Sequence, residues 1–384
     1  MLKRSARSDI SPFIVMDVME AAARREAAGD DVLHLEVGQP STPAPQAVIA
    51  AAAASLQSDK IGYSVALGIP ALRQRVARHY RETYRVDVSP EQVAITNGSS
   101  GGFVLAFLAA FDAGDRVVVT SPGYPCYRNI LSALGIEVVE VPVGAETRFQ
   151  PTPEVLADVA GRIDGLVVAS PANPTGTVIG SEDMRRLGDY CRARGVRIIS
   201  DEIYHGITYG ATSAVSALEH APEAIVVNSF SKYFSMTGWR LGWLVLPAEM
   251  VRAVERLAQN LFICAPTLSQ LGGVAAFDCY PELDAHVRRY AANREILLER
   301  LPRMGIGRTA PADGAFYVHA DVSHLTSDSP QLCRRLLEET GVAITPGIDF
   351  DPRRGRSFIR FSYSGGTPQV TEAMNRLERW LGAR

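Results

Sequence analysis

The chain has 384 residues, of which 47% are hydrophobic and 21% charged, so it is long enough for one large domain and a smaller one. A net charge of −3 argues against a nucleic-acid or membrane-surface partner. Five cysteines without paired spacing favour free thiols, and the absence of CxxC and HExxH patterns leaves a metal site without support. We expect a cytoplasmic protein, because the basic N-terminus runs into Asp, Ser and Pro and no segment has the apolar length of a membrane span.

An alanine-rich helix is expected at 47–54, and from about residue 90 to 250 short apolar runs alternate with helix-period segments. This alternation predicts an α/β fold with a mostly parallel sheet sandwiched by helices. In such sheets, ligands bind at the carboxyl ends of the strands. The predicted strands are 92–96, 116–121, 137–143, 165–170, 196–200, 224–229 and 242–246.

After residue 248 a long helical region leads away from this sheet. Strands at 315–322 and 357–363 then mix with helices, which predicts a smaller α+β domain. We therefore expect three parts: an N-terminal segment, 1–35, that contributes to the small domain and to a pocket lid; a large α/β domain, 36–280; and a small domain, 281–384.

Lys232 is one of only three lysines, with Lys3 and Lys60, among 39 basic residues, and it follows the predicted strand 224–229. Arginine stays protonated in proteins, whereas a desolvated lysine can lose its proton and become a nucleophilic amine. A surface lysine after a strand is the alternative. The apolar residues around Lys232 favour a role as a nucleophilic amine.

Polar residues follow other strands. Gly98, Ser99 and Ser100 begin a helix, where free backbone N–H groups and hydroxyls make an anion site, although a capped strand–helix turn is the alternative. Asn173 lies in a Pro-rich turn and carries a side-chain amide.

Charged residues occur at similar positions. Asp201 ends a buried strand, with Tyr204 three residues later, and its carboxylate needs a cation or several donors unless it caps a helix. Arg240 follows Lys232 by eight residues. Arg360 interrupts an apolar strand, where its planar fork suits a carboxylate, an internal salt bridge being the alternative.

Together these residues describe two ligands. One has a phosphate, a cationic ring nitrogen facing Asp201, an oxygen near Asn173 and Tyr204, and a carbonyl that Lys232 can attack. The other brings a carboxylate to Arg360. Pyridoxal 5′-phosphate and an amino acid meet every requirement.

With these motifs in order, the sequence resembles the class I/II aminotransferases, the fold-type I pyridoxal phosphate enzymes, over nearly its whole length. The matching segments are EVGQPSTPAP (36–45), YSVALGIPALR (63–73), TNGSS (96–100), SPGYPCY (121–127), SPANPTG (170–176), SDEIY (200–204), SFSKYFSMTGWRLGW (229–243) and FIRFSYS (358–364).

The resemblance implies a role for each matching residue. Lys232 would form a Schiff base with the cofactor and later move the proton between the substrate α-carbon and the cofactor, in ping-pong kinetics. Tyr63 would reach the phosphate in the partner subunit's site, so a homodimer is expected. The other implied roles are a phosphate cradle of Gly98, Ser99, Ser100, Ser229 and Arg240, a ring stacked by Tyr124 and held by Asn173, Asp201 and Tyr204, and a substrate carboxylate bound by Gly38, Asn173 and Arg360.

The positions that select the substrate are expected in the N-terminal segment around Ile10 to Val15 and at Gly38 and Tyr124, which are mostly apolar or small. No additional arginine is evident for a second carboxylate, which predicts an amino acid with a neutral or aromatic side chain. A pyridoxal-phosphate-dependent carbon–sulfur β-lyase shares the scaffold, but such lyases often carry a PHNP turn where this chain has PANPTG.

Two further motifs offer alternatives. GSSGG (98–102) matches a hydrolase nucleophile elbow at Ser100, with Asp201 and His286 or His319 as formal partners, but it leaves Lys232 and Arg360 unexplained. The segment 305–310 fits G-x-G-x-x-A, yet it precedes a proline in the wrong context and is expected to be a turn.

Overall fold

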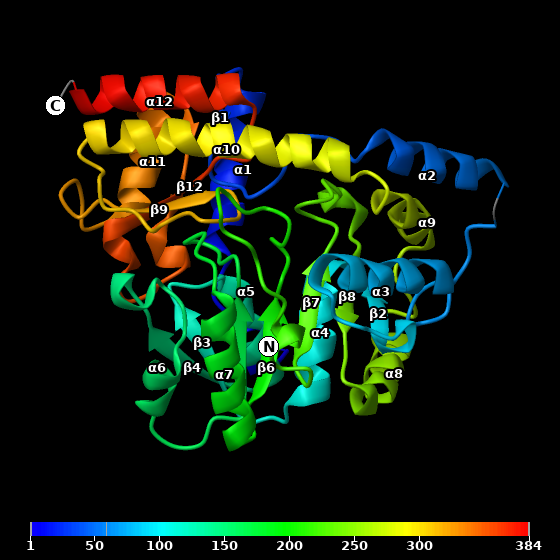
Figure 1. The fold of residues 1–384 in the computed structure, drawn as a ribbon. Helices are drawn as coiled ribbons and strands as arrows, with labels where there is room; N and C mark the ends of the chain where they lie inside the picture. The colour runs from blue at the N-terminus through cyan, green and yellow to red at the C-terminus, as the bar shows by residue number, and fades with distance from the viewer. Residues whose placement is uncertain (1, 59, 383–384) are drawn as a thin grey trace.

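The computed structural model describes residues 2–58 and 60–382. Seven strands form one sheet in the order β2-β8-β7-β6-β5-β3-β4, and every pairing is parallel except those of β8, which runs antiparallel to both neighbours (Figure 1). All seven predicted strands are confirmed. Their bounds are β2 (Val93–Thr96), β3 (Arg116–Ser121), β4 (Glu137–Pro142), β5 (Gly165–Ala169), β6 (Arg197–Asp201), β7 (Ile225–Ser229) and β8 (Gly242–Val245).

Helices cover both faces of this sheet because its strands are apolar on both sides. On β5, Leu166 and Val168 pack towards α7 (Ser181–Arg194), whereas Val167 packs towards α4 (Gly98–Ala110). Each such buried side chain contributes about 1.5–3 kcal/mol. The other helices around the sheet are α2 (Gln46–Ser58), α3 (Pro70–Tyr84), α5 (Pro125–Leu134), α6 (Pro153–Ala157), α8 (Val251–Leu261) and α9 (Thr267–Ala276).

A second, antiparallel sheet has the order β11-β12-β9, with β11 (Thr345–Pro346), β12 (Phe358–Ser362) and β9 (Tyr317–Asp321). The long helix α10 (Tyr280–Arg303) runs beside α12 (Thr367–Gly382), and α11 (Ser329–Thr340) lies near them (Figure 1). Short 3-10 helices connect these elements at Ala6–Ser8, Pro90–Gln92, Ala145–Thr147, Ala217–Glu219, Thr237–Trp239, Ala248–Met250, Gly347–Asp349 and Gly355–Ser357.

The N-terminal segment packs with the C-terminal elements. Strand β1 (Leu33–His34) pairs in parallel with β10 (Val342–Ala343), and the buried carboxylate of Asp349 accepts hydrogen bonds from the first backbone N–H groups of α1 (Ile14–Ala27), at 3.1 and 3.2 Å. The sequence did not predict these strands, because two residues are too few to show a period. We propose the division 1–35, 36–280 and 281–384, which places the second boundary at the first turn of α10. None of the helices in the described ranges has the length and apolarity needed to cross a membrane.

Candidate active site

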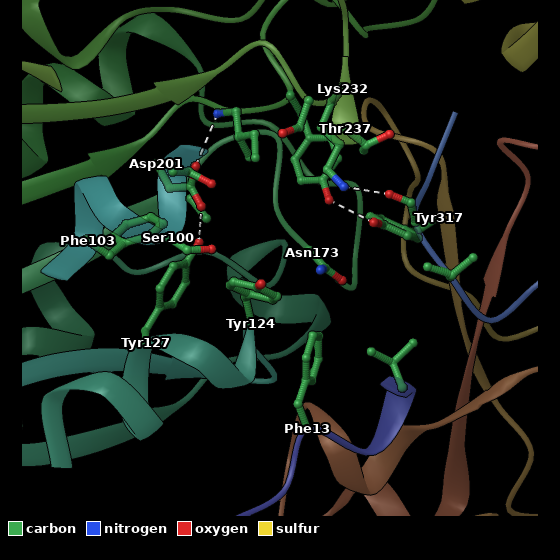
Figure 2. A pocket seen from close by; sticks show the side chains of 18 of the residues that line it. Phe13, Ser100, Phe103, Tyr124, Tyr127, Asn173, Asp201, Lys232, Thr237 and Tyr317 are labelled. Carbon is green, nitrogen blue, oxygen red and sulfur yellow. Dashed lines mark hydrogen bonds between the residues drawn. The ribbon is translucent and has the colours of Figure 1, made fainter. Parts of the chain in front are cut away.

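Ten of the predicted residues line one cavity of about 170 Å³, beyond the carboxyl ends of the parallel strands (Figure 2). They come from segments that are far apart in the sequence and meet only in the folded chain. The ten are Gly38, Ser99, Ser100, Tyr124, Asn173, Asp201, Tyr204, Lys232, Arg240 and Arg360.

Lys232 follows β7, and its Nζ donates a 2.5 Å hydrogen bond to the carbonyl oxygen of Gly38. Burial, and then the positive charges of Arg360 and Arg240, lower the pKa of the Lys232 amine to about 8. A lysine with an ordinary pKa near 10.5 is almost wholly protonated at neutral pH. This one keeps an appreciable neutral, nucleophilic fraction.

Asp201 is the last residue of β6 and is almost fully buried. Tyr127 donates a hydrogen bond to one carboxylate oxygen, and the backbone N–H of Ile203 donates to the other at 3.1 Å (Figure 2). Burial raises the pKa of Asp201 to about 6, a rise that the charge of Lys232 only partly offsets, and within the described ranges no lysine or arginine forms an ion pair with this carboxylate. No helix begins at Asp201, so the helix-cap alternative is wrong. The carboxylate has no ion-pair partner among the described residues, and a cationic ligand in the cavity can supply one.

Asn173 and Tyr204 both line the cavity. The oxygen of the Asn173 amide accepts a 2.9 Å hydrogen bond from Arg360, which leaves the amide nitrogen as the donor for a ligand. The hydroxyl of Tyr204 lies 2.7 Å from the hydroxyl of Tyr317, a residue that the sequence did not single out.

Arg360 is buried, with only 2% of its surface exposed. Its guanidinium donates to Asn173, to the carbonyl oxygen of Glu36 and, at 3.2 Å, to the hydroxyl of Thr345. No carboxylate in the described part of the chain forms an ion pair with it, so the internal salt bridge is wrong. A buried, uncompensated planar cation favours a carboxylate ligand.

The other end of the cavity has the character of an anion site. Helix α4 begins at Gly98, whose φ is +67°, and a Cβ built there would lie 2.6 Å from Arg240 Nη2. Glycine therefore lets the Arg240 side chain lie against the start of α4. The free N–H groups of the first helical turn, the hydroxyls of Ser99 and Ser100, and the guanidinium converge as phosphate requires.

Three predicted residues do not line the cavity. Gly98 has no side chain and so leaves room for the Arg240 guanidinium. Tyr63 is 83% exposed. The hydroxyl of Ser229 lies 2.8 Å from that of Ser231 and 3.0 Å from the carbonyl oxygen of Leu241, so Ser231 takes the lining position. The phosphate-binding role of Ser229 stays a prediction, and its hydroxyl lies directly behind the Ser231 side chain that lines the cavity.

The remaining wall is apolar. Phe13, Val15, Met16 and Val37 line it, with Phe13 packed edge-on against Tyr124 at 5.6 Å between ring centroids. Phe13 and Val15 belong to the segment around Ile10 to Val15 that the sequence predicts at the pocket, whereas Met16 and Val37 were not predicted there. In the described chain, the basic side chains that line the cavity are Lys232, Arg240 and Arg360, so none remains for a second carboxylate.

The alternatives from the sequence do not match this geometry. His286 lies 3.3 Å from the hydroxyl of Ser235, and His319 stacks on Phe358 at 4.9 Å, so neither histidine serves Ser100 and the hydrolase alternative is wrong. Gly305, with φ +80°, turns the chain after α10, and no helix follows it, as expected for a turn.

Comparison with known proteins agrees with the geometry. Residues 30–377 match the family described as aminotransferase class I and II. The valine–pyruvate aminotransferase of Mycobacterium tuberculosis is 55% identical over 378 residues, 98% of this chain and 97% of that protein. The (5-formylfuran-3-yl)methyl phosphate transaminase of Methanocaldococcus jannaschii is 33% identical over 373 residues, 96% of each chain.

Solved structures agree as well. The crystal structure of an aminotransferase from Mycobacterium tuberculosis has a TM-score of 0.98 at 54% identity and covers all of both chains. The aspartate aminotransferase from Thermus thermophilus with maleate has a TM-score of 0.92 at 32% identity, covering 99% of this chain and all of the other. The chain therefore belongs to the class I and II aminotransferases, a family that uses pyridoxal phosphate, and it is an aminotransferase.

Proposed function

We propose that this enzyme binds pyridoxal 5′-phosphate and moves the amino group of an L-amino acid with a neutral or aromatic side chain to a 2-oxo acid. The observation that carries the proposal is the position of Lys232 Nζ in one cavity with Asp201, Arg360 and the start of α4. The apolar wall and the relative named a valine–pyruvate aminotransferase support the substrate class.

The donor set fits this cofactor. The start of α4, with Ser99, Ser100 and Arg240, would hold the phosphate, and Ser231 extends the same wall. Asp201, buried without a cation, would hold the protonated ring nitrogen. Its pKa would fall on pairing. Tyr124 would stack on the ring.

When bound, the cofactor supplies an electron sink for the electron pair left when the substrate α-carbon loses its proton. Asp201 would keep the ring nitrogen protonated, while Asn173 and Tyr204 would donate to the ring oxygen. The neutral amine of Lys232 would hold the cofactor's aldehyde covalently. As a free amine, it would take up and return the proton of the substrate α-carbon.

The chain's residues would also orient the substrate. Arg360 would hold the α-carboxylate by its two-pronged fork, close to the backbone of Gly38. The side chain would then extend along Phe13, Val15 and Met16. Because the amino group stays with the enzyme after the first product leaves, the kinetics should be ping-pong.

We propose a homodimer and a cytoplasmic location. Tyr63 is exposed, and so are Ile61 at 41% and Val65 at 61%, which forms an apolar strip of the kind that a subunit interface covers. The five cysteines are free thiols, as is usual in a reducing compartment.

Borohydride reduction tests the covalent step. The reduced protein should carry the cofactor on the tryptic peptide that contains Lys232, and Lys232→Ala should carry none. Lys60→Ala, which removes an exposed lysine, is the matched control, and its Lys232 peptide should carry as much cofactor as that of the wild type. A colourless protein with no labelled peptide would refute the proposal.

A donor panel tests the substrate class. With pyruvate as acceptor, valine and phenylalanine should turn over faster than aspartate by more than about tenfold, because a second carboxylate would be buried unpaired against the apolar wall. Faster turnover of aspartate would contradict the substrate class. Release of ammonia from S-substituted cysteines at comparable rates would favour the β-lyase alternative.

A further inference from the structure

Tyr317 lies where the groups for the two ligands meet. It is the first residue of β9, it is 1% exposed, and it lines the active-site cavity. Its hydroxyl lies 2.7 Å from that of Tyr204, and Figure 2 shows Tyr317 on the same side of the cavity as Lys232. The guanidinium carbon of Arg360 lies 4.3 Å from the centre of its ring. One side chain thus contacts a group assigned to the cofactor and a group assigned to the substrate.

The fold holds this side chain in one position. In the β12–β9 pairing, Tyr317 is opposite Ser362 and Arg360 is opposite His319, so Tyr317 and Arg360 are diagonal neighbours on one face of the sheet. A Cβ built on Gly38 would lie 1.7 Å from the Tyr317 hydroxyl oxygen. The backbone of Gly38 therefore passes directly over the hydroxyl, and only glycine leaves room for it.

We propose that Tyr317 is a positioning residue, whose hydroxyl directs the proton of Tyr204 towards the cofactor's ring oxygen and whose ring supports Arg360 for the substrate carboxylate. This inference rests on the proposed function. Within the described chain, Tyr204 is the hydrogen-bond partner found for the Tyr317 hydroxyl. Because Tyr204 has one proton, it can give that proton to a ligand only if Tyr317 is the donor between them.

A chain of two donors stabilises negative charge on its final acceptor more than one donor does. Burial raises the pKa of both tyrosines, so both remain protonated at neutral pH. The ring has a separate effect. The guanidinium carbon of Arg360 lies 4.3 Å from the ring centre of Tyr317 and 4.7 Å from that of Phe350, and these cation–π contacts favour one orientation of the planar guanidinium.

Two substitutions separate these effects. Tyr317→Phe removes the hydroxyl and keeps the ring, whereas Tyr317→Leu removes both. Tyr363→Phe is the matched control, since Tyr363 is buried just after β12 but does not line the cavity. The first measurement is a pH titration of the visible absorbance of the Lys232-linked cofactor, and the second is the KM for valine.

Tyr317→Phe should raise the pKa obtained from this absorbance titration by about half to one unit, which is the equivalent of one hydrogen bond. Its KM for valine should stay within about twofold of the wild-type value. Tyr317→Leu should show the same upward shift and also raise KM by roughly 3- to 30-fold, as the loss of a cation–π contact predicts. Tyr363→Phe should match the wild type in both measurements.

A cofactor pKa in Tyr317→Phe equal to that of Tyr363→Phe overturns the inference while leaving the proposed function intact. So does a KM in Tyr317→Leu no higher than in Tyr317→Phe. If Tyr317→Leu does not fold, Tyr317→Met replaces it, and the titration of Tyr317→Phe decides the role of the hydroxyl by itself. Failure of the wild type to form the Lys232 adduct would overturn the proposed function and this inference together.

Discussion

Replacing Asp201 with asparagine should stabilise the cofactor-free protein, although it removes the carboxylate that would pair with the cofactor's ring nitrogen. In the folded chain the pKa of Asp201 is about 6, above its ordinary 3.8, because burial disfavours the carboxylate. As pH rises from about 4 to about 6, the unfolded chain has already released this proton while the folded chain still holds it. Stability is therefore lost over that range. Each pKa unit corresponds to about 1.4 kcal/mol, so the loss reaches about 3 kcal/mol above pH 6.

Asparagine has nearly the same shape and can still accept a hydrogen bond from Tyr127 or Ile203, but it has no proton to release. Denaturant unfolding of the cofactor-free proteins between pH 4 and 8 measures the difference. The advantage of Asp201→Asn should be small near pH 4, grow to about pH 6 and stay constant above it. Adding pyridoxal 5′-phosphate should reverse the order, because only the carboxylate pairs with the ring nitrogen. An Asp201→Asn protein that is no more stable than the wild type at pH 7.5 would refute the reasoning.

The remaining predictions concern the other ends of the site. Arg360→Lys keeps the charge but loses the planar fork, so kcat/KM for valine should fall about 10- to 100-fold, and Arg360→Leu should cost about 100-fold or more. A primary amine without a carboxylate should react equally with all three proteins, and an equal loss with that amine would contradict the assignment. The rate at which the cofactor-free protein captures the aldehyde should rise about tenfold per pH unit up to about pH 8 and level off above it, since the pKa of Lys232 is about 8. A stopped-flow rate that is flat from pH 6 to 9 would exclude the neutral amine as the reacting form. Mixing inactive Lys232→Ala chains with inactive Tyr63→Ala chains should restore activity, because a hybrid dimer would contain one site with both native residues. No recovery after verified subunit exchange would mean that Tyr63 does not cross between subunits.

The strands of the large sheet could be predicted because each is a short, β-branched apolar run between helical segments. The same runs placed Asp201 and Lys232 at the ends of neighbouring strands, where the structure brings them into one cavity. Arg360 was evident as a charge inside an apolar alternation.

The contacts that orient these groups were not predictable, because they depend on how separate elements pack. Tyr127 of α5 meets Asp201 at the end of β6, and Tyr317 of β9 meets Tyr204 in the turn after β6. Whether Ser229 or Ser231 faces the cavity depends on the turn after β7, which a period-2 pattern does not describe. The contact between Phe13 and Tyr124 joins residues more than a hundred positions apart.

Because the N-terminal segment packs against the last third of the chain, α1 cannot make its native contacts until most of the chain has been synthesised. Helix α1 is synthesised well before its capping residue, since Asp349 follows 335 residues after Ile14. At roughly 5–20 residues per second, that interval lasts roughly 15–70 s. During it the large sheet can form and pack, while the apolar face of α1 has nothing native to cover it. A nascent chain stalled before residue 342 should therefore expose this helix to chaperones and proteases, and release of the full chain should end that exposure.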